Sequence, residues 1–475
     1  MDIELTDIIR SDRELSRRQQ ASIALRLSGP AILAQLSSIA MQYIDAAMVG
    51  RLGAVSSASI GLVAAVTWLM GGVTSAVSYG YSVQVAQGLG AGEGERVRNV
   101  VRQGLLVLLG FSSIIGIIVA IFANQISYLM GGSGQMAEQA AGYLRCFAIF
   151  LPAVQFMHFG SALLQASGDM KTPGLLLTLM CIEDVFFNAL LIFPVDTADK
   201  TGIRAPFGFG AGLGVTGAAL GTCLAYLLTA GIMLYFACIR SEALHFRKSD
   251  HYQFDWGIIQ KANTIGGPMA FEEIALCGAQ IVSTTIVAPL GTVAVAAHSF
   301  AITAEAVCYM PGYGLEGAAS TLVGQSYGAG KKKLAKSFGW ITIALGMSIM
   351  AAAGFVMYFL CPFVFRFLTP VAEVQALGVA CLRIELLAEA LFGAAIVAAG
   401  ALRGAGDTMI PAGMSLLSMW GVRLTLAAVL SRSMGLRGVW IAMAIELSFR
   451  GIIFLIRFGR SKYLTQSEKS PTSKR

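Results

Sequence analysis

Long apolar runs alternate with short polar segments along almost the whole chain. A membrane-spanning helix needs roughly 20 consecutive apolar residues, and the runs reach or exceed that length. They lack the period-two alternation of a transmembrane β-strand, so the pattern favours helices over a barrel. We therefore predict spans at 27–49, 57–86, 104–124, 139–165, 173–194, 213–238, 264–288, 295–323, 337–363, 376–401, 411–433 and 437–457.

The second half of the chain repeats the first at a constant offset of 238 residues. Gly29-Pro30 recurs as Gly267-Pro268, and Gly168-Asp169 recurs as Gly406-Asp407. Six spans in each half keep both repeats in the same orientation, related by an axis along the membrane normal. We predict an all-α polytopic membrane protein of 12 transmembrane helices, in two six-helix lobes related by a pseudo-two-fold axis. Such repeats place the substrate path between the lobes. Three further pairs share the offset: Leu52-Gly53 with Leu290-Gly291, Gln87-x-x-Gly90-Ala91-Gly92 with Gln325-x-x-Gly328-Ala329-Gly330, and Leu144-Arg145 with Leu382-Arg383.

Basic residues set the expected orientation, because Lys and Arg collect in cytoplasmic loops. With both termini inside, the inside segments are the richer in Lys and Arg, and the loop from Pro194 to Gly212 is the largest on the outside. The expected divisions are a cytoplasmic segment 1–22, an N-lobe 23–239, a cytoplasmic connector 240–262, a C-lobe 263–458 and a cytoplasmic tail 459–475. The inside segments contain Arg96, Arg98, Arg102, Arg240, Arg247, Lys248, Lys331, Lys332, Lys333, Arg457, Arg460 and Lys462.

Composition supports the membrane assignment and removes several function classes. Only 13% of residues are charged, against about a quarter in soluble proteins. The net charge of +7 comes from residues flanking apolar runs, so nucleic acid is not an expected partner. The eight cysteines and four histidines show no metal-ligand spacing, and no nucleophile–base set is evident, which argues against a membrane-embedded enzyme. The sequence contains no motif that resembles a channel selectivity filter, which argues against a channel. We also expect no cleavable signal peptide before the first span.

Asp45 ends an apolar run that begins near Pro30 and contains no other charge. An ionisable residue inside a membrane span is by default a functional candidate; the alternative is a position at the membrane interface, capping the turn into Arg51. Asp184 and Asn188 lie one helical turn apart, hence on one face. They either complete a cation site with Asp45 or hydrogen-bond between helices. At the 238-residue offset these three positions correspond to Ser283, Val422 and Leu426, so the cluster is not duplicated.

These motifs resemble the multidrug and toxic compound extrusion (MATE) family of antiporters, bacterial type. The markers are Asp45-x-x-Met48-x-Gly50-x-Leu52-Gly53, the paired Gln-x-x-Gly-Ala-Gly loops, Gly267-Pro268, and the stretch from Ala401 to Thr408. The resemblance implies two lobes around a central cleft in the inner membrane, and export of amphipathic, mostly cationic compounds in exchange for Na⁺ or H⁺. It implies no cofactor besides the coupling ion. The expected partners are small organic cations and the lipid bilayer, and we expect a monomer.

The family's N-lobe cation site combines an acid in span one, two polar residues in span five and a threonine in span six. Asp45, Asp184, Asn188 and Thr222 resemble that set, and would be the Na⁺ ligands if coupling uses sodium. The order of Asp184 and Asn188 is reversed relative to the family pattern. The adjacent Glu183 points about 100° away and is expected to face another helix or an aqueous crevice.

The C-lobe has acids of its own. Glu272, four residues after Pro268, resembles the span-seven acid of many bacterial relatives. The span-ten aspartate of some relatives is replaced by Phe392, and Glu389 is a candidate substitute. Glu385 and Glu389 would repel each other if both were ionised. Arg423 is expected to form a structural ion pair with a glutamate, with substrate binding as the alternative.

Two points stay open at the sequence level. A lipid-linked oligosaccharide flippase of the same superfamily is the alternative function, although its anionic substrate would require several basic cleft residues. The choice of Na⁺ or H⁺ and the substrate are not readable from the sequence. Flexible methionines and flat aromatic rings suit a promiscuous cavity; the candidates are Met41, Tyr43, Trp68, Met70, Tyr79, Phe156, Met157, Tyr309, Met310 and Tyr313.

Overall fold

The computed structural model describes residues 5–11, 15–194, 210–247 and 252–461, and its named elements there are all helices. The first half contains α1 (Leu5–Arg10), α2 (Arg17–Gly50), α3 (Ala54–Ala91), α4 (Gly94–Leu129), α5 (Gly134–Ile149), α6 (Leu151–Ser167), α7 (Lys171–Ile192), α8 (Gly214–Tyr235) and η1 (Phe236–Arg240). The second half contains α9 (Trp256–Val287), η2 (Ala288–Leu290), α10 (Thr292–Gly328), α11 (Lys332–Leu368), α12 (Ala372–Glu385), α13 (Glu389–Gly404), α14 (Met409–Leu416), η3 (Leu417–Leu424), α15 (Thr425–Met434) and α16 (Leu436–Gly459).

The helices have the length and apolar surface of membrane spans. Within the described residues, 10 helices are long and apolar enough to cross a membrane, and two bent helix pairs bring the number to 12. On α4 the side chains of Ile114, Ile117 and Ile121 are each 60% exposed or more. Their spacing places them on one helical face, which lipid would cover. The prediction of twelve spans is therefore confirmed when each bent pair is one span.

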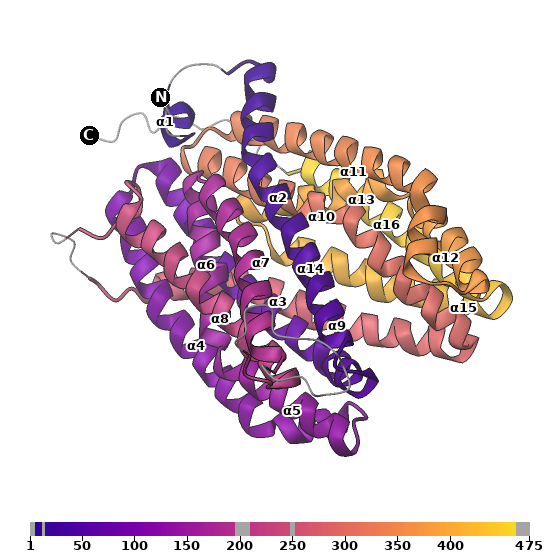
Figure 1. The fold of residues 1–475 in the computed structure, drawn as a ribbon. Helices are drawn as coiled ribbons and strands as arrows, with labels where there is room; N and C mark the ends of the chain where they lie inside the picture. Colours follow the sequence, from indigo (N-terminus) through magenta and orange to yellow (C-terminus); the bar gives the residue numbers. More distant parts are fainter. Residues whose placement is uncertain (1–4, 12–14, 195–209, 248–251, 462–475) are drawn as a thin grey trace, which may run out of the picture.

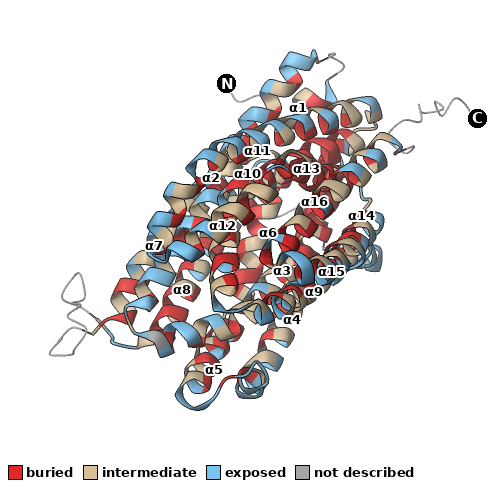
Figure 2. Cartoon of the chain, turned by 90° about the vertical axis from the view of Figure 1, so that its right-hand side faces the viewer, coloured by how far each residue is buried: buried red, intermediate tan, exposed pale blue. Residues whose placement is uncertain are grey.

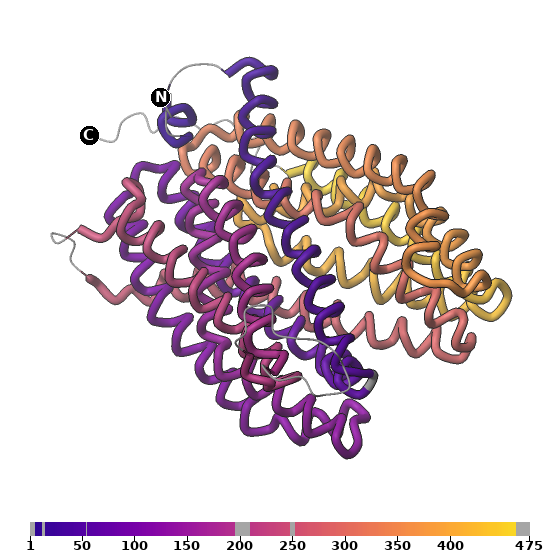
Figure 3. Tube along the Cα trace, viewed as in Figure 1, coloured from indigo at the N-terminus to yellow at the C-terminus, as the bar shows by residue number. Residues whose placement is uncertain are grey.

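The helices form two halves that lie side by side, indigo to magenta and orange to yellow in Figure 1. α2 runs diagonally between them, as the tube in Figure 3 shows, and packs on α7 of its own half and on α10 of the other. Helix starts repeat at the predicted offset: α3, α4, α5, α6 and α7 begin 238 residues before α10, α11, α12, α13 and α14. The chain thus has the two-lobed architecture predicted from its internal repeat.

Glycine positions explain why the repeat also preserves the turns. Gly53 and Gly291 precede equivalent helices with φ of 108° and 99°, and Gly92 and Gly330 follow the ends of these helices with φ of 84° and 75°. A residue with a Cβ rarely adopts such values, so glycine is needed in both copies. The shared glycines therefore fix where the chain reverses direction in each lobe.

Two predicted spans are broken, which the apolar pattern did not indicate. The span expected at 139–165 bends by 50° between α5 and α6, and the one at 376–401 bends by 56° between α12 and α13. The first break has a local cause, since Pro152 near the start of α6 has no N–H for the preceding turn. The second falls between Glu385 and Glu389, at the point equivalent in the repeat. The span expected at 411–433 is also irregular, because η3 is a π-helix around Arg423.

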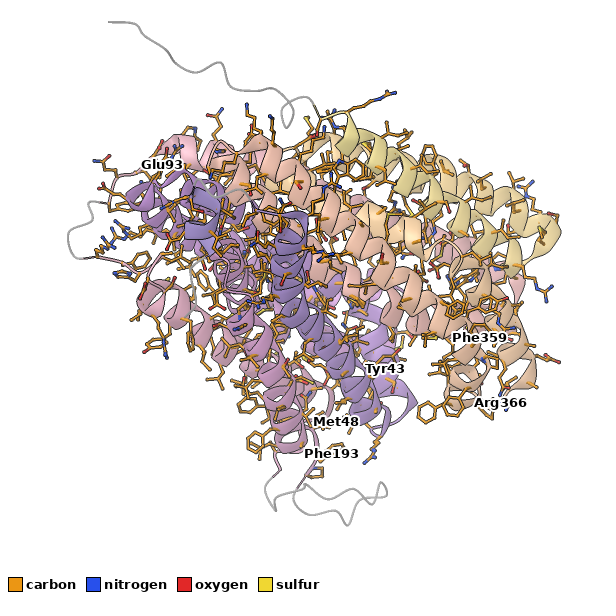
Figure 4. All side chains as sticks on the ribbon, turned by 90° about the horizontal axis from the view of Figure 1, so that it is seen from above. Tyr43, Met48, Glu93, Phe193, Phe359 and Arg366 are labelled. Atoms are coloured by element: carbon orange, nitrogen blue, oxygen red, sulfur yellow. The ribbon has the colours of Figure 1, made fainter. Side chains whose placement is uncertain are left out.

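Burial follows the division into halves. In Figure 2 the buried positions run through the interior of each half, while exposed positions lie along outer faces such as those of α2 and α7. Met48 and Phe193 belong to one hydrophobic cluster at the end of the first half remote from Glu93 (Figure 4). The end that contains Glu93 also contains α1 and the end of α16. Both contact the start of α11: Lys331 donates a hydrogen bond to Arg10 O of α1, and Lys336 donates one to Gly459 O of α16.

At this end the two halves meet through equivalent residues, which we call the glutamine–glycine seam: Gln87, Gly90, Gln325 and Gly328. A Cβ at Gly90 would lie 2.0 Å from Gln325 O, and a Cβ at Gly328 would lie 2.0 Å from Gln87 O. The backbones are therefore in direct contact, which only glycine permits. The Gln87 amide donates to Gly404 O (3.1 Å) and the Gln325 amide donates to Ala166 O (2.8 Å). Residues 404 and 166 again differ by 238, so each bond has its counterpart across the pseudo-two-fold axis.

Candidate ion and substrate sites

The polar residues predicted in the first lobe come together between α2 and α7. Asn188 Nδ2 donates to Asp45 Oδ1 at 2.8 Å and to Asp184 Oδ2 at 3.0 Å. Asp184 and Asn188 are almost completely buried, whereas Asp45 is half-buried. One amide therefore bridges two neighbouring carboxyl groups. Asp45 lies inside α2, five residues before its end at Gly50, and does not cap the turn into Arg51.

The cluster offers unused oxygen atoms. Asp184 Oδ1 and Asn188 Oδ1 are buried without a hydrogen-bond partner among the described residues. The Thr222 side chain on α8 lies beside the Asp184 carboxyl group. No group of three or more His, Cys, Asp or Glu side chains in the described part of the chain could hold a metal ion. Here two carboxyl groups, an amide and a hydroxyl would supply oxygen ligands, the type that hard cations prefer.

Glu183 points away from this cluster, as its place on the helix predicts. It is half-buried, and Thr229 on α8 donates a hydrogen bond of 3.2 Å to Glu183 Oε2. In the second lobe Ser283, the counterpart of Asp45, is buried in α9. The two lobes therefore differ in chemistry at this level although their helices correspond.

A cavity of about 390 Å³ lies between the lobes, next to the aspartate cluster. Its walls come from α2, α3, α6, α7 and α8 of the first lobe and from α9, α10 and α13 of the second. Met180 and Tyr226 belong to the wall, and Asp184 lies one helical turn beyond Met180. A compound in the cavity would therefore lie within about one helical turn of the cluster. Of the aromatic and methionine candidates, Tyr79, Met157 and Tyr313 line the cavity.

The charged part of the cavity wall is organised by Arg403 on α13. Its guanidinium forms ion pairs with Glu272 on α9 (3.0 Å) and with Glu316 on α10. All three side chains are largely buried. Glu316 and Arg403 line the cavity, whereas Glu272 does not; its neighbour Glu273 does. The structure thus places the predicted residue Glu272 in an ion pair behind the wall.

Glu389, the other acid predicted in the second lobe, lies at the break between α12 and α13. Glu389 and Glu385 are fully buried, and the carboxylate oxygens of both have no hydrogen-bond partner among the described residues. Glu305 on α10 is an electrostatic neighbour of both. None of these three glutamates lines the cavity between the lobes. They form a separate acidic group inside the second lobe.

The expected ion pair of Arg423 is not formed at contact distance with any described residue. The Arg423 guanidinium donates instead to the Met443 sulfur at 2.9 Å. The nearby Glu446 pairs with Arg450 at 2.5 Å and accepts from Ser418. Arg450 lies one turn from Glu446 on the same helix, which favours their ion pair over one between Glu446 and Arg423.

Sequence reasoning missed Glu305, Glu316 and Glu446. Each is a charged residue inside an apolar run, the signal that singled out Asp45, and each is buried in the structure. Sequence reasoning also could not assign Arg403 to its two partners, because these lie on α9 and α10. A systematic inspection of every charge within the predicted spans would have found the residues, although not their partners.

Comparison with known proteins agrees with this geometry. The MatE family model matches residues 30–190 and 268–429, two ranges whose starts differ by 238 residues. The chain is 30% identical over 464 residues to a probable multidrug resistance protein NorM of Brucella suis, covering 92% of each chain. It is 26% identical over 461 residues to a probable multidrug resistance protein NorM of Thermotoga maritima, covering 94% of this chain and 93% of that protein.

Solved structures show the same fold. A MATE family transporter in an outward-facing conformation superposes with a TM-score of 0.87 at 20% identity, covering 97% of this chain and 99% of that one. A Vibrio cholerae MATE transporter gives a TM-score of 0.84 at 16% identity, covering 95% of this chain and 99% of that one. The family model covers well over half of the sequence, in two copies that coincide with the two lobes. The chain is therefore a multi-pass membrane protein of the MATE family of transporters.

Proposed function

We propose that this protein is a secondary active antiporter that exports amphipathic, mostly cationic organic compounds in exchange for Na⁺ or H⁺. The observation that carries the proposal is the position of the Asp45–Asn188–Asp184 cluster, one helical turn behind the wall of the cavity between the lobes. Coupling requires that cation binding and substrate binding influence each other, and adjacent sites on shared helices can do so. The NorM relatives carry names of multidrug resistance proteins, which supports the substrate class.

In the proposed mechanism, Asp45, Asp184, Asn188 and Thr222 bind the coupling cation. Neutralising two adjacent carboxyl groups changes how α2 packs against α7, because Asn188 links the two helices. α2 also packs on α10 of the other lobe. A shift of α2 would therefore alter the contact between the lobes and favour one of two lobe arrangements. Alternating access would then follow from rocking of the lobes around the cavity.

We further propose that the protein is a monomer in the inner membrane with both termini in the cytoplasm, with lobes at 23–239 and 263–458. Basic residues at the end with α1, including Arg10 and Lys331, support that orientation. The outside loop expected at Pro194–Gly212 lies mostly outside the described residues. The cavity wall has two glutamates, Glu273 and Glu316, and one arginine, a balance that disfavours the anionic substrates of a flippase.

The proposal is tested by export of a cationic dye, ethidium, from proteoliposomes with an imposed pH or Na⁺ gradient. Wild-type protein should export ethidium with one gradient, and Asp45→Asn should lose the gradient dependence. The matched control is Ser283→Asn, the same side chain at the equivalent position of the other lobe, which should export normally. Export that no gradient drives, or normal coupling in Asp45→Asn, would contradict the proposal.

A further inference from the structure

We propose that Glu273 is the residue that recognises the positive charge of the substrate, separately from the aspartates that bind the coupling ion. This inference rests on the proposed function and assigns its substrate specificity to one side chain. Glu273 lies on α9 of the second lobe and lines the cavity. It is an exposed residue, in contrast to its buried neighbour Glu272. A compound in the cavity can therefore reach its carboxylate.

Glu273 also reaches across to the first lobe. A Cβ at Gly72 on α3 would lie 2.9 Å from Glu273 Oε2, so the carboxylate packs against the bare backbone of that helix. Gly72 itself lines the cavity. The carboxylate thus lies where the two lobes face each other. A cation bound there would touch both lobes at once.

The charge balance leaves Glu273 available for a ligand. Arg403 forms ion pairs with Glu272 and Glu316, and among the described residues Glu273 has no ion pair or hydrogen bond of its own. Arg403 has all three glutamates as electrostatic neighbours. One guanidinium therefore faces three carboxylates, two of which it contacts. A monovalent organic cation beside Glu273 would reduce this negative excess.

The remaining cavity wall fits an aromatic cation. Tyr79 and Tyr313 present rings that can lie against a positive charge. Met157, Met180 and Met269 add flexible apolar surface, which adapts to ligands of different shape. The substrate class is therefore an amphipathic monocation whose charge lies next to aromatic or aliphatic groups.

The test uses binding of tetraphenylphosphonium to purified full-length protein, followed by its transport in proteoliposomes. Glu273→Gln should raise the Kd by about tenfold, which corresponds to about 1.4 kcal/mol. In transport, KM should rise while the gradient dependence of export is kept. Glu273→Asp should restore part of the affinity. Glu183→Gln, a half-buried carboxylate outside the cavity, is the matched control and should bind as wild type does.

The outcomes separate this inference from the proposed function. Wild-type affinity in Glu273→Gln, with gradient-driven export intact in the wild type, would overturn the role of Glu273 alone. Absence of any tetraphenylphosphonium binding or export by the wild type would overturn both. Gly72→Ala provides a second variant, because its methyl group displaces the carboxylate without removing its charge. It should weaken binding in the same direction, and wild-type affinity there would also argue against the inference.

A different observation carries a second inference: the glutamine–glycine seam is the gate that closes the cavity at the end containing α1. Ala86, Gln165, Ala166 and Thr321 line the cavity, and Thr321 Oγ1 donates across the lobes to Gln165 O at 3.0 Å. The hydrogen bond from Gln325 to Ala166 O lies in the next helical turn of α10. The seam therefore lies directly beyond the end of the cavity nearest α1. A compound can enter the cavity from this end only if the two halves of the seam separate.

The gate is tested with a reporter cysteine, Ser75→Cys, on the exposed part of the cavity wall. Membrane-impermeant maleimide is applied in oriented vesicles from the side that contains α1. Adding Gly328→Val should prevent closure and increase labelling several-fold over the reporter alone. Gly110→Val is the matched control, because a Cβ at Gly110 would meet open space. Gln325→Leu removes one cross-lobe bond without overpacking and should increase labelling less. Unchanged labelling in both Gly328→Val and Gln325→Leu would contradict the gate.

Discussion

Asn188 on α7 donates a hydrogen bond of 2.8 Å to the carboxylate of Asp45 on α2. The same amide donates a hydrogen bond of 3.0 Å to Asp184, so it joins the two acids. Two carboxyl groups and the link between two helices therefore depend on one amide. This dependence makes Asn188 as informative a target as either aspartate.

Asn188→Leu should uncouple export from the driving gradient and lower stability. The variant keeps the branched shape of the side chain but leaves two carboxyl groups without their donor. An unsatisfied buried polar group costs about 1–3 kcal/mol. The measurements are thermal unfolding in detergent and gradient-driven ethidium export. Asn124→Leu, at an exposed amide on α4 that accepts from Arg145, should change neither.

Arg403→Met should destabilise the protein strongly. It would leave Glu272 and Glu316 buried without their shared cation, and breaking a buried ion pair in this way costs about 3–5 kcal/mol. The combination with Glu316→Gln should recover part of the loss, because the two changes act on one interaction. Arg457→Met breaks a more exposed pair with Asp407 and should cost less. Equal losses of thermal stability in the two single variants would count against the shared-cation arrangement.

Arg10→Ala should loosen the end of the bundle that contains the seam. The Arg10 guanidinium donates to Leu89 O and Gly90 O in the last turn of α3, and Lys331 of the other lobe donates to Arg10 O. α1 therefore links the two lobes beside Gly90. Hydrogen exchange should become faster at residues 87–92 and 325–331 and stay unchanged elsewhere. The comparison variant is Arg17→Ala, at an exposed residue in the first turn of α2, which should leave these amides protected.

Glu389→Gln should raise the unfolding temperature and lower gradient-driven export. Both oxygens of this fully buried carboxyl group lack partners among the described residues, and Glu305 is a like-charged neighbour, so an ionised side chain costs stability that a neutral amide avoids. Such a cost is expected where a group is kept for function. Glu389 is also our C-lobe candidate for substrate or ion coupling. A variant that is more stable and transports normally would remove Glu389 from the mechanism.

The sequence predicted the elements well because the repeat constrains them. Helix starts at residues such as 94 and 332 follow from paired glycines, which the chain needs in order to turn. Asp45, Asp184 and Asn188 could be grouped because two of them lie one turn apart and the third stands alone in an apolar run. That grouping also allowed for hydrogen bonds among the three residues.

Other features depend on packing that no pattern shows. Glu272 and Glu273 are adjacent in the sequence, yet one lies behind the cavity wall and the other on it, because they point about 100° apart. The bend beside Glu389 has no proline near it, so the sequence does not indicate it. Arg423 was expected to pair with a glutamate, but the nearby Glu446 pairs instead with Arg450 of its own helix.

The reciprocal contact at the seam has a consequence for how such a chain can originate. Each half presents the same patch to the other, Gln87 and Gly90 meeting Gln325 and Gly328, which is the arrangement of an isologous homodimer. A half-length ancestor could form both contacts from a single sequence, but any acid gained in its core would appear twice. Joining two copies into one polypeptide removes that restriction. An aspartate can then face a serine at the equivalent position, and a symmetric scaffold can hold an ion site on one side only.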